Sequence, residues 1–170
     1  SGGSANDDTA YAIARVGAVQ SWEAYRYGID ANIAFGGGWS LSGKLRGQHS
    51  DKALIAGEQF GLGGIGSVRG LRDRESSGDR GHTLNLEVQA PQVAPGLAPY
   101  AFYDMGYRAY TVPVPAVSNS EGVASVGLGA RWNWEKRFEL NAAYANVLNG
   151  IAGGTQSGHG KLHFSLFYRF

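Results

Sequence analysis

An arginine and an aspartate are the residues of this sequence best suited to a specific polar contact. Arg69 lies in a glycine-rich, charged segment at residues 57–81, and Asp104 lies in a later segment where polar and apolar residues alternate. A guanidinium offers a planar fork of donors that suits a two-point contact with a carboxylate. If both groups face a narrow interior, each needs the other, because an unpaired buried charge is costly. The alternative is a solvated loop, in which both groups simply face water.

Other combinations of reactive residue types carry less weight. The glycines of residues 61–66 imitate a phosphate-binding loop, but no helix follows whose N-terminus could hold an anion. Residues 49–51 (His-Ser-Asp) contain the residue types of a hydrolytic triad, yet adjacent side chains on a strand point to opposite faces. We therefore expect no enzyme, and neither a metal nor another cofactor. Three histidines have no metal-ligand spacing: His82, His159 and His163, of which His163 is expected to line the lumen.

The composition allows one domain but does not decide between water and membrane. The 170 residues suit a single domain, and 43% hydrophobic residues can support a core. Mean hydropathy is −0.24 and no apolar run approaches the roughly 18 residues of a membrane helix, but transmembrane strands also average to near-neutral hydropathy. A net charge of +1 with both signs interspersed gives no electrostatic case for a nucleic-acid partner. The absence of cysteine suits passage through an oxidising periplasm.

Polar and apolar residues alternate in about eight segments, which predicts an all-β, antiparallel fold. The clearest segment places Leu84, Leu86 and Val88 on one face and Asn85 and Glu87 on the other. The first predicted strand is the least regular. The predicted strands cover approximately residues 9–20, 24–35, 39–49, 82–90, 98–107, 122–133, 137–147 and 161–170.

The connections between these segments favour a transmembrane β-barrel over a soluble one. Short linkers at 36–38, 91–97 and 134–136 alternate with long ones at 50–81, 108–121 and 148–160. Short turns on one side, long loops on the other and an even strand number are typical of outer-membrane barrels, and they would place both termini in the periplasm. The apolar rows would then face acyl chains. Four tryptophans fall at strand ends, where aromatic girdles lie at the bilayer interfaces: Trp22, Trp39, Trp132 and Trp134.

The sequence divides into two parts. Residues 1–8 begin Ser-Gly-Gly-Ser and are interpreted as a linker of an excised or engineered piece. Residues 9–170 are interpreted as one outer-membrane barrel domain, with a long extracellular loop at about 50–81. On the predicted register, Glu87 and Arg131 face the lumen, where they either extend a polar network around Asp104 or are ordinary wall residues.

Three short motifs lie in the long loop, on the strand at 98–107 and at the end of the last strand. In the loop, Glu58-Gln59-Phe60 precedes a Val-Arg-Gly tripeptide and a Gly-Asp-Arg-Gly run. Together the motifs resemble the transporter component of two-partner secretion, the haemolysin secretion/activation type of the barrel-assembly outer-membrane protein superfamily. The matching residues are Val68, Arg69, Gly70, Gly78, Asp79 and Gly81 in the loop, Phe102, Asp104 and Gly106 on the wall, and Leu166, Tyr168 and Phe170 in a terminal assembly signal.

This resemblance implies a larger assembly than the chain itself. Such transporters have sixteen strands, periplasmic polypeptide-transport-associated domains and a plug helix, and their signature loop joins strands eleven and twelve. Here the loop joins the third and fourth of eight predicted strands, as in the carboxy-terminal half of such a barrel. We expect the chain to close as a small barrel or to pair with a second copy in a homodimer. An eight-stranded barrel is too narrow to admit the loop.

The resemblance also implies a function in the outer membrane of Gram-negative bacteria. Its parent would export an unfolded exoprotein across the bilayer without a nucleotide, with a loop-to-wall contact between Arg69 and Asp104. The implied partners are lipid or detergent, the exoprotein and the barrel-assembly machinery. Three alternatives stay open: a fragment of a barrel-assembly insertase, a self-standing eight-stranded barrel (adhesin, structural protein or lipid-modifying enzyme), and a soluble ligand-binding barrel.

Overall fold

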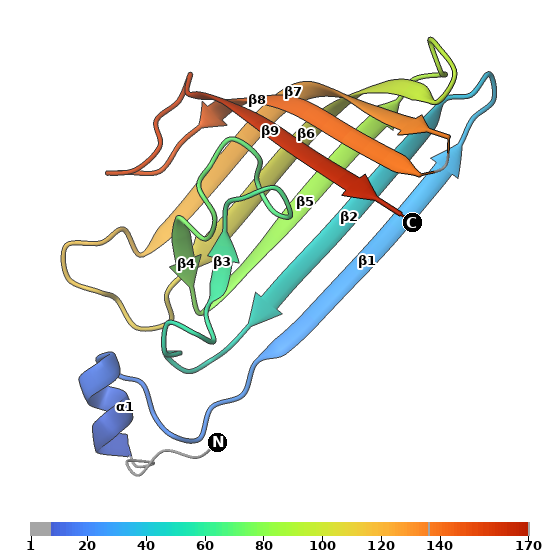
Figure 1. The fold of residues 1–170 in the computed structure, drawn as a ribbon. Helices are drawn as coiled ribbons and strands as arrows, with labels where there is room; N and C mark the ends of the chain where they lie inside the picture. Colours follow the sequence, from blue (N-terminus) through green and yellow to red (C-terminus); the bar gives the residue numbers. More distant parts are fainter. Residues whose placement is uncertain (1–7, 136, 170) are drawn as a thin grey trace.

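One antiparallel sheet of seven strands forms the body of the computed structural model, which describes residues 8–135 and 137–169 (Figure 1). Each strand pairs with its neighbour in the chain, apart from a hairpin inserted after the second. The prediction of an all-β, antiparallel fold is therefore confirmed. The strands are β1 (Tyr25–Ala34), β2 (Ser40–His49), β5 (Arg80–Gln89), β6 (Leu97–Ala109), β7 (Ser120–Trp134), β8 (Phe138–Asn149) and β9 (Gly160–Tyr168).

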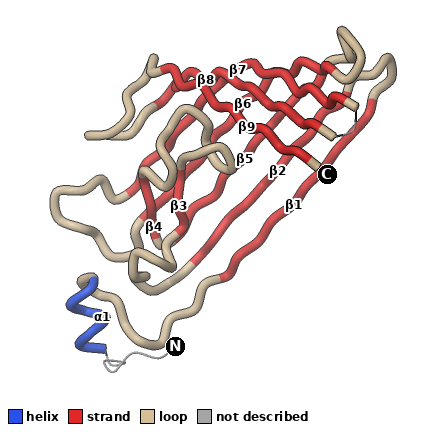
Figure 2. Tube along the Cα trace, viewed as in Figure 1, coloured by secondary structure: helices blue, strands red, loops and turns tan. Residues whose placement is uncertain are grey.

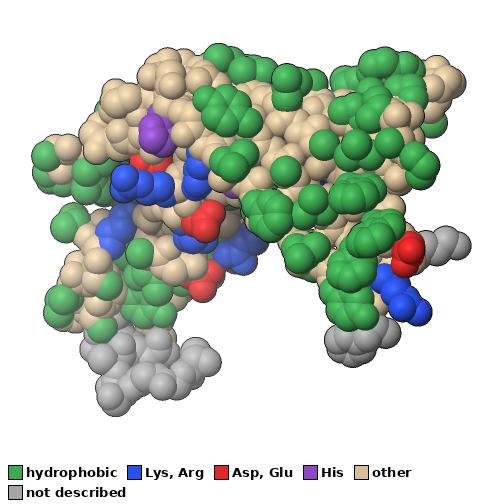
Figure 3. Space-filling view, turned by 45° about the horizontal axis from the view of Figure 1, so that its top comes forward, with side chains coloured by type: hydrophobic (Ala, Val, Ile, Leu, Met, Phe, Trp, Pro, Cys, Tyr) green, Lys and Arg blue, Asp and Glu red, His purple; other side chains and the backbone are tan. Residues whose placement is uncertain are grey.

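The sheet is curved, and its two faces differ in chemistry. The convex face is apolar: Phe164 of β9 is 66% exposed, and Leu86 of β5 is 37% exposed. Asn85 and Glu87, between the apolar residues of β5, contact groups on the concave side. On the face shown in Figure 3, most charged side chains gather at the end that holds the loops, and hydrophobic side chains spread over the other end. The predicted outward orientation of the apolar rows is thus confirmed.

The edges of the sheet, β1 and β9, do not pair with each other within the described residues. The sheet therefore forms an open, curved wall rather than the closed eight-stranded barrel that was one of the two expectations. Short turns follow β1, β5 and β7, whereas long loops follow β2, β6 and β8 at the opposite end (Figure 2).

The segment at residues 9–20, predicted as a first strand, instead contains the helix α1 (Asp8–Ala14). Its sequence, DTAYAIA, has no alternating polar positions, its alanines are strong helix formers, and Asp8 lies at the N-terminal end, where a negative charge is favourable. Gly17, with a φ of +80°, follows the helix. The prediction of a strand here was wrong, and the main sheet has seven strands rather than eight.

The helix also corrects the predicted position of the chain ends. Figure 1 shows α1 beside the long loops, whereas β9 runs towards the end with the short turns. The two ends of the described chain therefore lie at opposite ends of the strands, one near the long loops and the other near the short turns, and not at the same end as predicted. Most of the predicted linker, residues 1–7, lies outside the described residues, and Asp8 belongs to α1. No helix in the described part of the chain is long and apolar enough to cross a bilayer.

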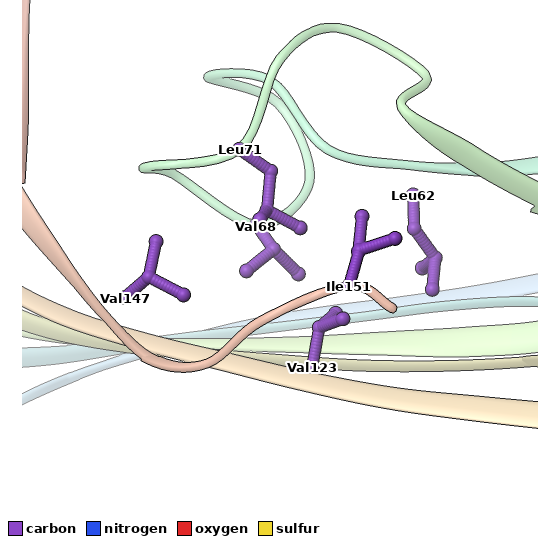
Figure 4. Packing of buried hydrophobic residues seen from close by; sticks show 6 residues of the cluster. All are labelled: Leu62, Val68, Leu71, Val123, Val147 and Ile151. Atoms are coloured by element: carbon purple, nitrogen blue, oxygen red, sulfur yellow. The ribbon is translucent and has the colours of Figure 1, made fainter. Parts of the chain in front are cut away.

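The long loop after β2 folds against the concave face. It contains a short hairpin of β3 (Phe60–Leu62) and β4 (Ser76–Gly78), which the sequence did not predict. Apolar side chains of the loop meet side chains of the wall in one buried cluster, so the largest apolar core lies between loop and wall. Figure 4 shows its members: Leu62, Val68 and Leu71 of the loop, Val123 of β7, Val147 of β8, and Ile151 after β8.

The orientation of the last strand can be tested with a charge placed on either face. We expect Phe164→Arg to lower the free energy of unfolding in lipid vesicles by about 2–4 kcal/mol, because the new guanidinium would face acyl chains. Ser165→Arg, one residue further along β9 and on the concave side, should lower the free energy of unfolding much less. Equal losses for the two variants, measured by urea unfolding, would contradict the assignment of the faces.

Candidate functional site

The tip of the long loop is attached to the wall by Arg69 and Asp104. Arg69 Nε donates to Asp104 Oδ2 at 2.7 Å, and its Nη2 donates to Oδ1 at 2.7 Å. The backbone N–H of Arg69 donates to Oδ2 as well, at 3.1 Å. The side chain of Arg69 is 9% exposed and that of Asp104 is fully buried. The structure therefore places a two-point, charge-assisted contact between a loop and the centre of β6, a geometry that fixes direction as well as distance.

Asn85 of β5 joins the loop and the aspartate. Its side-chain amide donates to Asp104 Oδ1 at 2.8 Å and also to the carbonyl oxygen of Ser67, two residues before Arg69. Asn85 lies opposite Asp104 on the neighbouring strand, so both side chains project to the concave face at the same level. The wall thus offers the loop a carboxylate and an amide side by side.

A second carboxylate balances the charge around the pair. Glu87 Oε2 lies 3.4 Å from Arg69 Nη1, and Glu87 Oε1 accepts from Arg131 at 2.5 Å. The two guanidinium groups also lie over aromatic rings, Arg69 over Phe102 at 3.5 Å and Arg131 over Tyr100 at 4.2 Å to the ring centroid. The cluster contains two arginines and two carboxylates, counting Asp104, and it is therefore neutral as a whole.

Arg69 remains charged in this environment. Burial alone would lower the pKa of its guanidinium, but hydrogen bonding to Asp104 and the charges of Asp104 and Glu87 outweigh burial and raise the pKa above its ordinary value. A buried lysine can become neutral by releasing a proton, but an arginine cannot. Withdrawing the loop would therefore separate the charged guanidinium from its carboxylate partners.

Glycines allow the loop to approach the wall closely. Gly70 has a φ of +99°, and a Cβ on it would lie 2.8 Å from Val147 Cγ2. Gly106 of β6 lies beneath the loop, where a Cβ would lie 2.8 Å from Leu62 and 3.1 Å from Val68. Val68 itself is fully buried in the apolar cluster. The Val-Arg-Gly tripeptide thus combines an apolar anchor, a charged anchor and a turn.

The other loop motif lies where the loop returns to the sheet. A Cβ on Gly78 would lie 2.7 Å from the carbonyl oxygen of Ala109, and one on Gly81 would lie 2.4 Å from that of Tyr107. A side chain at either position would push β4 or β5 away from β6, because backbone atoms cannot yield as flexible side chains do. These two glycines therefore hold the base of the loop against the wall.

Asp79, between these glycines, connects three separate segments. It forms a two-point ion pair with Arg15, which follows α1, and it accepts backbone N–H bonds from Leu54 and Thr111 at 2.8 Å each. Burial would raise the pKa of Asp79, but hydrogen bonding to Arg15 and to the two amides outweighs burial and lowers it. Sequence reasoning missed Arg15; its only signal was a charge within an otherwise apolar segment.

Two further carboxylates join the long loops and were not foreseen either. Glu75 accepts from the N–H and the hydroxyl of Thr155 at 2.8 Å, which ties the signature loop to the loop after β8. Glu121 accepts from Arg108 at 3.0 Å and from the hydroxyl of Ser76 at 2.7 Å. The loops are therefore linked to one another by hydrogen bonds and ion pairs rather than by apolar packing alone.

The predicted terminal signal lies on the convex face, as far as the structure describes it. Leu166 and Tyr168 are 57% and 52% exposed, and the Tyr168 ring lies 4.8 Å from that of Phe138. Phe170 lies outside the described residues. A role of these residues in assembly stays a prediction.

The residues resembling a hydrolytic triad are not arranged as one. His49 Nε2 lies 3.0 Å from Asp51 Oδ1, but Ser50 is buried and donates to the carbonyl oxygen of Glu23 at 2.7 Å. The serine therefore has no base beside it. Within residues 8–135 and 137–169, no group of three or more His, Asp or Glu side chains could hold a metal ion.

Comparison with known proteins gives consistent matches to one group. The family described as haemolysin secretion/activation protein ShlB/FhaC/HecB matches residues 5–132, which include the loop and β6. The heme/hemopexin transporter protein HuxB of Haemophilus influenzae (strain 86-028NP) is 30% identical over 112 residues, covering 62% of this chain and 20% of HuxB. The outer membrane transporter CdiB of Dickeya dadantii (strain 3937) is 35% identical over 96 residues, covering 53% of this chain and 17% of CdiB.

A solved structure supports the fold. CdiB from Acinetobacter baumannii superposes with a TM-score of 0.66 at 24% sequence identity, over 84% of this chain and 26% of CdiB. The chain therefore spans about a fifth of the length of the curated relatives that it matches.

Whether the loop tip requires glycine at position 70 can be tested by adding a single methyl group there. We expect Gly70→Ala to weaken docking of the loop by about 1–3 kcal/mol, because alanine is strained at this φ and its Cβ would meet Val147. Trypsin should then cleave after the exposed Arg72 at least several times faster in detergent. Gly57→Ala is the matched control, since a Cβ there meets nothing within 4 Å; equal cleavage in both variants would argue against a tightly docked tip.

The depressed pKa of Asp79 predicts a stability that depends on pH. Its contribution is complete above the unfolded-state pKa of about 3.9 and is lost as the pH falls through the lower folded-state value. At neutral pH, Asp79→Asn should speed hydrogen exchange of the Leu54 and Thr111 amides by about ten- to a hundredfold, because hydrogen bonds to a charged group are lost.

Asp51→Asn is the control for this experiment, because the Asp51 side chain is 86% exposed. The wild type should keep slow exchange of both amides down to about pH 4 and lose it in stronger acid. Unchanged exchange in Asp79→Asn would show that the carboxylate does not hold the segments together.

Proposed function

This chain belongs to the haemolysin secretion/activation protein family (ShlB/FhaC/HecB), and we propose on that premise that it forms part of the wall of a pore that exports an unfolded exoprotein. It is an outer-membrane chain, like its relative CdiB. The observation that carries the proposal is the anchored loop: a buried ion pair between Arg69 and Asp104 holds the loop tip on the polar, concave face of an outer-membrane sheet.

The open edges of the sheet support a barrel with more strands than this chain supplies. In hydrocarbon, each unpaired backbone group costs several kcal/mol, so β1 and β9 need strands beside them. If the signature loop joins strands eleven and twelve, as in the family, β2 is the eleventh strand and β9 the sixteenth. We therefore assign the seven strands to positions ten to sixteen, with the other nine supplied by further sequence. In the alternative, a second copy of the chain would add seven strands and give fourteen in total.

The space beside the loop tip suits a polypeptide in transit. A cavity of about 450 Å³ lies beside the tip and is lined by residues of the tip and of β1, β2, β5, β7 and β8. An extended chain could exchange hydrogen bonds with its polar lining without being held by apolar burial. The loop occupies the same lumen, so it would shift to widen the path or guide the segment along the wall. The lining includes Asn32, Ser42, Lys44, Asn85, Gln89 and Asn141.

The remaining features of the proposal are carried by the resemblance. Export would need no nucleotide, because folding of the exoprotein outside the cell would draw it through. The barrel-assembly machinery would recognise the terminal strand at Leu166, Tyr168 and Phe170. The name of HuxB refers to heme and hemopexin, and this chain covers 20% of HuxB.

The structure favours this proposal over the alternatives. A self-standing eight-stranded barrel would need an eighth strand at residues 9–20, where α1 lies instead. A soluble ligand-binding barrel would bury Leu162 and Phe164, which are 73% and 66% exposed. An insertase fragment of the same superfamily would share the sheet, but the family match is to the secretion branch.

Substitutions at the ion pair test the proposed function directly. In the complete transporter, Arg69→Ala should reduce secretion of the exoprotein at least about tenfold, because removing one partner of a buried pair costs several kcal/mol. Exchanging the two residues for each other should restore only part of the activity, since an aspartate at position 69 would face Glu87 and lose the contact with Phe102.

Arg72→Ala is the matched control, because Arg72 is an exposed arginine of the same loop. Exoprotein in the medium would be quantified against the amount of folded barrel in the outer membrane. Normal secretion by Arg69→Ala at normal barrel levels would refute the proposal that this contact serves export.

A further inference from the structure

The tip of the signature loop also contacts the last strand, β9. Lys161 Nζ of β9 donates to the carbonyl oxygen of Leu71 at 2.8 Å. The backbone N–H of Gly70 donates to His163 Nε2 at 3.3 Å. In the sheet, β7 and β8 separate β9 from β6, so the residues that follow Arg69 bridge the concave face from one part of the wall to another.

Both contacts satisfy backbone groups that the docked loop has removed from water. Leu71 is fully buried, and a buried carbonyl oxygen without a partner is costly. Lys161 supplies that partner from the wall. Gly70 is held in a left-handed conformation, so its N–H points to a side chain rather than to a neighbouring strand. These hydrogen bonds are therefore part of the docking of the loop.

The contact with Gly70 also fixes the protonation state of His163. A backbone N–H can only donate, so Nε2 must carry a lone pair and the neutral ring must carry its proton on Nδ1. A second proton would remove the acceptor. The charged groups that face the ring are Lys161 on its own strand, Arg69 and Asp73 of the loop, and Asp104 of β6.

We propose that Lys161 and His163 are positioning residues that form a second anchor for the loop tip on β9, and that protonation of His163 releases that anchor. The inference rests on the proposed function, in which this loop occupies the lumen of an export pore. The two anchors differ in kind: the first depends on a guanidinium, which cannot be deprotonated in proteins, whereas the second includes an imidazole, which titrates in the physiological range. The loop would leave the lumen readily only when both anchors are open.

A single cysteine can report whether the loop tip is docked. The sequence contains no cysteine, and Val68, next to Arg69, is fully buried. Val68→Cys keeps a small, apolar side chain in the cluster and becomes reactive only when the tip leaves it. The probe is a membrane-impermeant maleimide applied to cells carrying the complete transporter, with any cysteine outside this chain replaced by serine. Val117→Cys, at a site 45% exposed, gives the rate for a residue that is always accessible.

Three variants on β9 then test the second anchor. We expect Lys161→Met and His163→Leu each to raise the labelling rate of the reporter about three- to tenfold, which corresponds to the loss of one hydrogen bond. Ser165→Ala should leave the rate unchanged, because Ser165 lies on the same concave row without a hydrogen bond to the loop. If all three variants label like the parent, the second anchor does not exist.

The pH profile separates an anchor from a merely structural histidine. Thiols lose their reactive thiolate form as the pH falls, so the labelling rate of the parent is divided at each pH by that of Val117→Cys. This ratio should rise as the pH falls through the range in which histidine titrates, ordinarily around 6.5. His163→Gln, whose amide oxygen can accept the same N–H at any pH, should keep slow labelling without this rise. A rise that persists in His163→Gln would overturn the assignment of the switch to His163.

The same experiment distinguishes this inference from the proposed function. If the His163 variants change the labelling rate but Arg69→Ala does not change secretion, the second anchor is supported and the export proposal is overturned. If Arg69→Ala lowers secretion but the Lys161 and His163 variants label like the parent, the export proposal is supported and the second anchor is overturned.

Discussion

The buried contact between Arg69 and Asp104 is the constraint that explains the arrangement around it. A buried ion pair need not stabilise a fold relative to apolar packing, but losing one partner leaves a charge without compensation and costs about 3–5 kcal/mol. The pair therefore acts by making one position of the loop far better than any other. Asn85 and Glu87 complete its hydrogen bonds, and Gly106 leaves the space that the tip requires.

The loop also supplies half of the largest apolar cluster among the described residues. A curved sheet whose convex side faces lipid cannot bury its apolar rows within itself, so its interior packing depends on what enters the concavity. Here Leu62, Val68 and Leu71 of the loop meet Val123 and Val147 of the wall. Asp79 and Glu121 then bind the base of the loop to its neighbours. The docked loop is thus part of the fold, and displacing it would lose apolar packing as well as the ion pair.

The sequence predicted those features that depend on local pattern or on chemistry, and missed those that depend on the path of the loop. Alternation located the strand at 82–90 because a half-exposed sheet imposes a period of two. The pair of Arg69 and Asp104 could be proposed because each needed a partner of opposite charge. The prediction of a strand at residues 9–20 was wrong because an apolar run without polar alternation fits a helix as well as a strand. The contacts of Arg15 and His163 were unpredictable, because they depend on where a loop of some 25 residues places its backbone.

The width of the lumen connects the loop to the number of strands. Strands lie about 4.8 Å apart, so seven strands make an arc of roughly 34 Å, less than half the circumference of a barrel of sixteen. An eight-stranded barrel holds little more than its own side chains. The docked loop instead brings a hairpin and a buried tip, held on β6 by Asp104 and on β9 by Lys161 and His163. The tip therefore extends over the concave face from β6 across β7 and β8 to β9, which is more room than an eight-stranded barrel leaves inside it.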